Sequence, residues 1–266
     1  TREKTLTELK EKKHVKFVSL IHDVEELRAF RYNDYYKGEF DFMLRIADVW
    51  IVHNAVMKQF FIERGVPETK IVTLGIFDYL QSGSVDRKPQ FERTITVAGN
   101  LDTEKCGYVG QLGHLSGVQV KLFGMNYDKK MDQCENVRYY GSFPTDEIPG
   151  KLTGGFGLVW DGAGIDGCIG QSGQYLRYNN PHKLSLYLSS GLPVIIWKEA
   201  AEAAFVKIQG VGICVDSLKE LSTIFEMLDE NAYNGYAEAA RVLSEKIRTG
   251  QFGRMAIRTA EDILGL

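Results

Sequence analysis

The residues with the clearest chemical potential lie in the segment NNPHKLSLYLSSGLPVIIW, where a lysine follows a proline by two positions and precedes an apolar run. Asn179 or Asn180 is typical of a helix N-cap, and Pro181 suits the first turn because that position needs no amide donor. Gly191 is typical of the left-handed residue that follows a helix. We therefore predict a helix over residues 181–190.

The start of this predicted helix has the properties of an anion site. Its first-turn amides and its dipole favour negative charge, and Lys183 adds a full positive charge beside them. His182, Asn179 and Asn180 are its neighbours in the sequence. The expected ligand is the diphosphate of a nucleotide. A capped surface helix with an incidental lysine is the alternative interpretation.

A candidate general base lies earlier in the chain, where the run HVKFVSLIHD ends in His22 and Asp23. Polar residues are typical of the carboxyl ends of parallel strands, where ligands bind. A base that accepts the proton of a hydroxyl is usually an imidazole or a carboxylate, and His22, Asp23 and Glu25 are of these types. The alternative is that Asp23 caps the helix that follows.

A glycine-rich run, GAGIDG at residues 162–167, matches the G-x-G-x-x-G pattern of dinucleotide-binding proteins. We exclude an NAD site because CIGQSGQYL, which follows, is too glycine-rich for the helix that such a site needs. Residues 183–190 also lack the carboxylate that binds the ribose. We predict instead a mobile loop, with Asp161 and Asp166 at its edges, that closes over the ligand. A disordered surface loop is the alternative.

The composition excludes several classes of protein. The 266 residues carry 32 basic and 35 acidic side chains, so no global positive field is available to hold nucleic acid. The four cysteines form no C-x-x-C pair, so we expect neither a zinc site nor a disulfide framework. No apolar run is long enough to span a bilayer, and no signal peptide opens the sequence. We expect a cytoplasmic protein, or one peripheral to the inner face of the membrane.

Strands and helices alternate along the chain. Helices are predicted over residues 6–13, 40–47 and 55–65. Three strands are predicted in the first part, over residues 14–23, 48–54 and 70–78. Six more follow a polar linker at residues 81–90, over residues 91–100, 118–126, 136–143, 154–162, 192–197 and 211–216. The pattern predicts an α/β fold with two Rossmann-like domains that face a cleft, the second complete and the first incomplete at its N-terminus.

The run NPHKLSLYLSSGLPVI resembles the nucleotide-binding helix of GT-B glycosyltransferases, which commonly show P-x-K-L-x-E-Y-x-A-x-G-x-P-V. More narrowly, IHDVEELR, GGFGLVWDG and the run ending in LPVIIW resemble the glucosyltransferase 3-like family. That family includes enzymes that add a second sugar to bacterial adhesin glycans, and relatives described as β-1,6-galactofuranosyltransferases. The resemblance covers nearly the whole chain. It implies a GT-B fold, a UDP-sugar donor, no metal requirement and self-association as a homo-oligomer.

The resemblance also implies a domain organisation. Residues 1–88 would form the acceptor-side domain, and residues 89–253 the domain that binds the nucleotide sugar. In GT-B proteins the terminal helix commonly crosses back to the first domain, which residues 254–266 would do here.

Carried over by position, the resemblance suggests further contacts to the donor. Gly99 and Asn100 match the G-N that ends the first strand of the nucleotide domain, and Lys105 is the candidate for the basic residue that follows. Phe143 corresponds to an aromatic beside the uracil, although ordinary core packing is equally compatible with it. Leu186 stands where many GT-B members have a ribose-binding glutamate, so ribose contacts must come from elsewhere. The residues that we assign to the donor are Lys183, Asn179, Asn180, His182, Lys105, Asn100, Gly99, Phe143 and Asp161.

We therefore predict a hexosyltransferase that moves a hexose, preferably glucose, from a UDP-sugar to a sugar acceptor on a glycan or glycoprotein. Galactofuranosyl transfer is one alternative. A UDP-sugar epimerase, which needs no acceptor, and a non-catalytic subunit of an active partner are two others. The sequence leaves the donor sugar, the acceptor, the linkage and the stereochemical course open.

Overall fold

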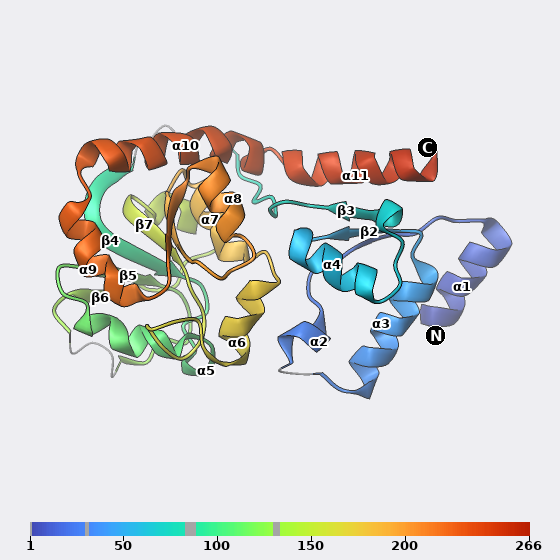
Figure 1. The fold of residues 1–266 in the computed structure, drawn as a ribbon, viewed down its shortest axis with the longest axis horizontal. Helices are drawn as coiled ribbons and strands as arrows, with labels where there is room; N and C mark the ends of the chain where they lie inside the picture. The colour runs from blue at the N-terminus through green and yellow to red at the C-terminus, as the bar shows by residue number, and fades with distance from the viewer. Residues whose placement is uncertain (1, 30–31, 83–88, 130–133) are drawn as a thin grey trace. The chain divides into compact units, whose positions relative to one another are not determined.

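A computed structural model describes residues 2–29, 32–82, 89–129 and 134–266. The chain forms two compact units, unit 1 with Thr1–Phe77 and Phe252–Leu266, and unit 2 with Asp78–Gln251. Each unit contains its own parallel sheet with helices beside it (Figure 1). Most of the predicted linker at residues 81–90 lies outside the described residues.

Unit 1 is built on a three-stranded parallel sheet in the order β1-β2-β3. The strands are β1 (Val18–Leu20), β2 (Val49–Val52) and β3 (Ile71–Thr73). The helical elements in its described residues are α1 (Arg2–Lys13), α2 (Glu25–Arg28), α3 (Asp34–Ile46), α4 (Ala55–Glu63), the 3-10 turn η1 (Glu68–Lys70) and α11 (Gln251–Leu264). Each strand lies inside its predicted range and is shorter, because apolar residues next to a strand, such as Leu74 and Ile76 after β3, are buried without being part of the sheet.

Both faces of the central strand β2 are covered. Successive side chains of a strand point to opposite faces. Trp50 and Val52 of β2 therefore join one apolar cluster with side chains of α3 and α4, whereas Val49 and Ile51 join a second cluster with Ala256 of α11. Burial on both faces explains why β2 is a continuous apolar run rather than an alternating one.

Unit 2 is built on a six-stranded parallel sheet in the order β6-β5-β4-β7-β8-β9. The strands are β4 (Gln90–Ala98), β5 (Gln119–Phe123), β6 (Val137–Tyr139), β7 (Gly154–Val159), β8 (Val194–Trp197) and β9 (Gly212–Val215). Its longer helices are α7 (His182–Ser189), α8 (Ala203–Gln209), α9 (Leu221–Met227) and α10 (Glu230–Arg248). Its shorter helical segments are α5 (Thr103–Cys106), η2 (Gly107–His114), η4 (Ile148–Lys151), α6 (Gly170–Gln174), η5 (Tyr175–Arg177) and η6 (Leu218–Glu220).

The strand order of unit 2 defines where a ligand is expected. The chain adds β5 and β6 on one side of β4, then returns to add β7, β8 and β9 on the other side. The order therefore reverses between β4 and β7, which makes this a doubly wound sheet with its switch point at its centre. The α/β class and the six strands of this unit agree with the sequence-based prediction.

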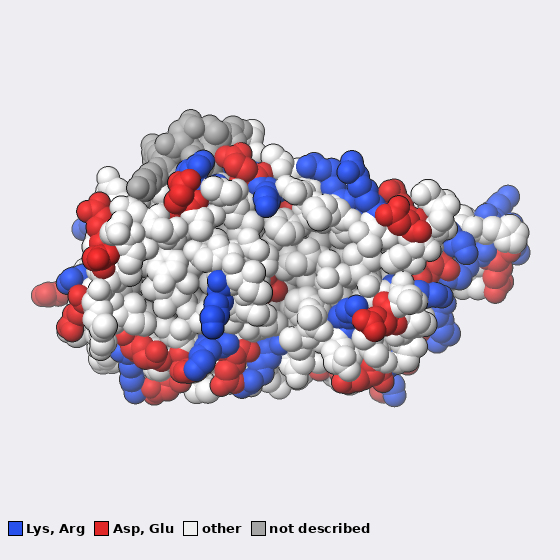
Figure 2. All heavy atoms as spheres, turned by 45° about the horizontal axis from the view of Figure 1, so that its top comes forward, with Lys and Arg blue, Asp and Glu red and all other residues white. Residues whose placement is uncertain are grey.

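The surface carries charges of both signs. On the face shown in Figure 2, acidic and basic side chains are interspersed and neither sign forms an extended field. This distribution agrees with the near balance of 32 basic and 35 acidic residues in the sequence.

Candidate active site

The carboxyl ends of β4 and β7 lie next to each other at the switch point of the unit 2 sheet. In open α/β sheets this edge is the usual place for a ligand. Gly99 and Asn100 follow β4, and Asp161 follows β7. Lys183, in the first turn of α7, reaches the same edge because its side chain contacts Asp161. The structure thus brings together four of the residues that the sequence assigned to the donor.

The side chain of Lys183 is held by two oxygens at the end of β7. Its Nζ lies 2.8 Å from Asp161 Oδ1 and 2.8 Å from the carbonyl oxygen of Trp160. The Lys183 and Asp161 side chains are only 12% and 8% exposed. Burial alone would lower the pKa of Lys183, but the Asp161 carboxylate more than offsets it, so the pKa lies above its usual value. The ammonium stays charged, and two of its three N–H donors are engaged by these oxygens.

Helix α7 begins one residue later than the sequence predicted, at His182. Pro181 is the N-cap residue, with an extended backbone (φ −71°, ψ 129°), and no side chain caps the helix. The prediction that Asn179 or Asn180 supplies the cap was therefore wrong, because the extended Pro181 moves both residues out of the cap position. A helix start without a side-chain cap is a usual place for an anion.

The neighbours of Lys183 differ in burial. Asn180 is buried, Asn179 is half-buried, and His182 is exposed. The Oδ1 atom of Asn179 is buried and accepts no hydrogen bond among the described residues. Asn179 therefore has an acceptor that a ligand could satisfy, while the contacts of all three residues to a donor remain predictions.

The loop after β4 is tied to its neighbours. Asn100 Oδ1 accepts hydrogen bonds from the Asp102 amide at 3.1 Å and from Asn126 Nδ2 at 2.9 Å. A Cβ atom on Gly124 would lie 1.7 Å from the carbonyl oxygen of Gly99, so the loops after β4 and β5 approach too closely for a side chain there. Asn100 thus fixes the shape of this edge.

Lys105 lies in α5, and its side chain is exposed. Its carbonyl oxygen accepts a hydrogen bond from the Gly162 amide at 2.8 Å, which ties α5 to the loop after Asp161. The backbone of Lys105 is therefore at the candidate site, and contact of its ammonium with a ligand stays a prediction.

Tyr187 is a component of this edge that the sequence analysis did not assign. Its hydroxyl accepts a hydrogen bond from the amide of Ala98, the last residue of β4, at 2.8 Å. Its ring lies over Gly157 of β7, where a Cβ atom would be 2.2 Å from the ring. Burial raises the pKa of Tyr187 to about 12, so the hydroxyl stays neutral. Tyr187 joins α7 to both central strands one turn after Lys183, a position that in sequence looks like ordinary core.

Two buried thiols fill the space beside Asp161. Cys106 Sγ donates to the carbonyl oxygen of Asn100 at 3.2 Å and lies 3.9 Å from Asp161 Oδ1. Burial raises the pKa of both Cys106 and Cys168. Because the reactive form of cysteine is the thiolate, neither side chain is suited to act as a nucleophile.

Phe143 follows β6 and is half-buried. Its ring centroid lies 6.1 Å from that of Phe123, and Lys151 Nζ lies 5.0 Å from it. The ring therefore has a packing partner, and a contact with uracil remains a prediction.

The glycine-rich run 162–167 forms a closed, hydrogen-bonded loop. Trp160 Nε1 donates to the Gly164 carbonyl at 2.9 Å, and the Ala163 amide donates to the Ile169 carbonyl at 3.1 Å. Asp166 forms an ion pair with Lys219 at 2.7 Å. The expectation of a mobile or disordered loop finds no support in these bonds. No helix starts at the third glycine, since α6 begins only at Gly170, which agrees with the exclusion of an NAD site.

In unit 1, the predicted base residues lie at the carboxyl end of β1. Both His22 and Asp23 are exposed. The His22 ring stacks on Phe77 with centroids 5.5 Å apart, and the buried His53 ring meets Phe77 edge-on at 4.9 Å. Residues that follow β1, β2 and β3 therefore meet at one edge.

Asp23 does not cap the next helix. The N-cap residue of α2 is Val24, without a side-chain cap, and Asp23 Oδ2 instead lies 3.2 Å from Arg28 Nη1. The capping alternative was therefore wrong, because the helix starts one residue too late for it. Asn54, by contrast, does cap α4 by accepting the Met57 amide at 3.0 Å.

No set of three or more His, Cys, Asp or Glu side chains in the described residues is arranged to hold a metal ion. None of the helices that the structure describes has the length and apolar character to cross a membrane.

Two family models match the chain along most of its length. The glucosyltransferase 3-like N-terminal domain matches residues 1–76, and the glucosyltransferase 3-like C-terminal domain matches residues 95–260. The chain belongs to the glucosyltransferase 3-like family. The family resemblance expected from the helix motif is thereby confirmed.

Relatives of known name are glycosyltransferases. Beta-1,6-galactofuranosyltransferase WbbI of Escherichia coli (strain K12) is 36% identical over 256 residues, which cover 94% of this chain and 72% of WbbI. Glucosyltransferase 3 of Streptococcus gordonii is 27% identical over 243 residues, which cover 91% of this chain and 70% of that protein. This glucosyltransferase 3-like chain is accordingly a transferase.

Solved structures show the same fold at low sequence identity. Anabaena HepE in complex with UDP-glucose superposes with a TM-score of 0.63 at 13% identity, over 99% of this chain and 77% of HepE. WaaG, a glycosyltransferase involved in lipopolysaccharide biosynthesis, superposes with a TM-score of 0.58 at 13% identity, over 98% of this chain and 81% of WaaG. The GT-B fold expected from the sequence is confirmed.

Proposed function

We propose that this chain transfers a hexose from a UDP-hexose to a hydroxyl group of a sugar acceptor, and that Lys183 and the first turn of α7 bind the donor diphosphate. The observation that carries the proposal is the buried, charged Lys183 at the uncapped start of α7, at the switch point of the unit 2 sheet. An ammonium beside the start of a helix forms a site for phosphate oxygens.

The same groups suit the chemistry of transfer. As the bond between the anomeric carbon and the diphosphate oxygen breaks, negative charge develops on the departing UDP. A fixed ammonium and oriented amides stabilise that charge. The acceptor hydroxyl forms the new glycosidic bond and loses its proton to a base, for which His22 and Asp23 remain our candidates.

Two donors are supported by different relatives. Glucose is the sugar that the family name suggests, through Glucosyltransferase 3 of Streptococcus gordonii. UDP-galactofuranose is the second candidate, because identity is higher with WbbI, at 36% compared with 27%. Incubation of the chain with each donor and a panel of sugar acceptors distinguishes them. Product that forms without an acceptor would instead indicate an epimerase.

A thermal-shift titration with UDP, GDP and NAD tests the nucleotide site. A ligand that binds only the folded state raises the melting temperature. We expect UDP to stabilise the parent chain and not the Lys183→Ala variant, and NAD to stabilise neither. Lys207→Ala, on the exposed side of α8, is the matched control and should respond as the parent does. Stabilisation by NAD in place of UDP would overturn the proposal.

The resemblance to the family further suggests self-association. Sedimentation velocity of the purified chain tests it, because a dimer or larger species sediments faster than the 30.0 kDa chain.

A further inference from the structure

Unit 1 contains a surface pocket that the diphosphate site does not involve. It lies among α2, α3 and the end of α4 and has a volume of about 460 Å³. This volume falls within the range of roughly 300–1,000 Å³ that is typical of small-molecule sites. Its lining combines aromatic rings with charged side chains, and the residues that matter here are Glu25, Glu26, Tyr36, Lys37, Phe40 and Arg64.

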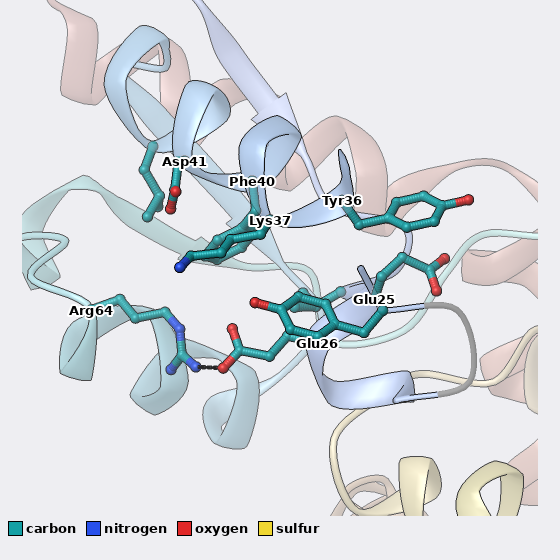
Figure 3. A pocket seen from close by; sticks show the side chains of 10 residues that line it. Glu25, Glu26, Tyr36, Lys37, Phe40, Asp41 and Arg64 are labelled. Atoms are coloured by element: carbon teal, nitrogen blue, oxygen red, sulfur yellow. Dashed lines mark hydrogen bonds and ion pairs between the residues drawn. The ribbon is translucent and has the colours of Figure 1, made fainter. Parts of the chain in front are cut away.

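The aromatic part of the pocket is anchored in the core of the unit. The Phe40 ring packs against Phe60 and Phe61, with centroids 6.1 Å and 5.6 Å away. Tyr36 precedes it by one helical turn and is half-buried. Figure 3 shows Tyr36 and Glu25 at one end of the pocket and Arg64 and Asp41 at the other. A ligand here would meet a rigid apolar surface between two polar ends.

The charged groups favour a ligand that donates hydrogen bonds. Arg64 is already paired with Glu26, and Glu25 Oε1 accepts from Arg28 at 2.7 Å. Glu25 Oε2 is buried, and no donor among the described residues reaches it. Burial of an acceptor without a donor is unfavourable, so a ligand hydroxyl that donates to this oxygen would stabilise it.

We propose that this pocket binds a hexose ring of the sugar acceptor, with its hydroxyls donating to Glu25 and Glu26 and its apolar face against Tyr36. A neutral polyol fits better than an anion, because the three carboxylates of the lining outnumber its two cations, Lys37 and Arg64, and Arg64 is paired with Glu26. Hydrogen bonds from hydroxyls to carboxylates are among the strong ones. The proposal rests on the proposed function, since it assigns the acceptor of that reaction.

Saturation-transfer NMR on the full chain, with methyl hexopyranosides and hexose disaccharides as probes, tests the pocket. We expect at least one probe to bind the parent. Glu25→Gln and Tyr36→Ala should each weaken that binding about tenfold, because each removes one strong contact. Glu39→Gln is the matched control: it lies on α3 outside the pocket and is paired with Arg2, as Glu25 is paired with Arg28. This variant should bind as the parent does.

Lys183→Ala separates the two possible sugar sites. Sugar bound in the pocket persists in this variant, whereas sugar bound at the donor edge is lost. The proposal is overturned if no probe binds the parent, if Lys183→Ala abolishes binding, or if both pocket variants bind like the parent. A UDP thermal shift on the parent chain reports on the proposed function independently: if UDP does not stabilise the parent while the sugar signal is intact, the proposed donor site is refuted and the pocket stays in place.

Discussion

The ammonium of Lys183 and the carboxylate of Asp161 form an ion pair of 2.8 Å that joins the first turn of α7 to the end of β7. Both side chains are largely buried, so each compensates for the cost of burying the other. Such a pair adds little net stability but strongly constrains where the two elements meet. The helix start is therefore held at the sheet edge before any ligand arrives.

The Lys183→Ala variant should lose stability as well as UDP binding. Without the ammonium, Asp161 is a buried carboxylate with no cation, and breaking a buried pair in this way costs about 3 kcal/mol. Urea denaturation followed by circular dichroism measures the loss in the free energy of unfolding. UDP should no longer raise the melting temperature.

The double variant Lys183→Ala/Asp161→Asn separates the two effects. It removes the unpaired charge, so most of the stability should return, while UDP binding should stay absent. Recovery of UDP binding in the double variant would show that Lys183 acts only as a partner for Asp161 and not as a ligand of the diphosphate.

Tyr187→Phe should weaken the junction between α7 and β4. The change leaves the buried Ala98 amide without its acceptor, which costs about 1–2 kcal/mol in the free energy of unfolding. Because Ala98 directly precedes Gly99 and Asn100, we also expect several-fold weaker UDP binding by calorimetry. Tyr35→Phe, at an exposed tyrosine of unit 1, is the control and should change neither quantity. Parent-like stability of Tyr187→Phe would contradict the assigned role of this hydrogen bond.

Gly157→Ala should be strongly unfavourable although it adds one methyl group. The new Cβ would lie 2.2 Å from the Tyr187 ring, inside a strand that is buried on both faces. Overpacking of this kind costs about 1–3 kcal/mol or more. Gly110→Ala is the control, because a Cβ there meets no atom within 4 Å. Equal thermal stability of the two variants would show that the Tyr187 ring moves aside at no cost.

Much of the fold could be predicted because buried parallel strands have a distinctive composition. The run 192–197 is apolar and β-branched, and it forms β8 in the middle of one half of the unit 2 sheet. The predicted ranges are longer than several strands because buried apolar residues continue past the sheet, as Leu74 and Ile76 do after β3. The α7 motif could be predicted because Pro181, Lys183 and Gly191 each occupy a position that local helix chemistry explains. Pro181 suits the start of the helix, Lys183 lies in its first turn, and Gly191 takes the left-handed conformation that follows its end.

The rest depends on contacts between distant residues. The Tyr187 hydroxyl meets an amide 89 positions away, and no local pattern reports such a bond. The glycine-rich run looked mobile because its composition permits many conformations, whereas Ser217 and Leu218 bind Ile165 from 52 and 53 positions away. The pocket of unit 1 also combines three helical elements, so its residues could not be assembled from spacing alone.

Stability should fall as the pH rises above about 8.5, the ordinary pKa of a cysteine thiol. Burial raises the pKa of Cys106 and Cys168, so both thiols stay protonated in the folded state while they ionise in the unfolded state. The unfolded state then binds fewer protons, and each thiol contributes a slope of up to about 1.4 kcal/mol per pH unit. Urea denaturation between pH 8 and 10 should show a shallower fall for Cys168→Ala than for the parent. Cys134→Ala is the control for the loss of a thiol. If the free energy of unfolding falls with pH equally steeply in Cys168→Ala and in the parent, the buried Cys168 thiol does not cause the pH dependence.

Sugar transfer should proceed in the presence of EDTA. Where a metal ion neutralises a diphosphate, carboxylates must hold it, but Asp161 is already paired with Lys183 and Asp102 caps α5. The ammonium and the α7 amides supply the positive charge that the leaving UDP needs. Initial rates with the preferred donor should be the same with EDTA and with added Mg²⁺ or Mn²⁺. If EDTA abolishes the activity and Mn²⁺ restores it, this prediction is wrong. A metal ion would then bind the diphosphate, and Asp161 would be a ligand of that metal rather than a fixed partner of Lys183.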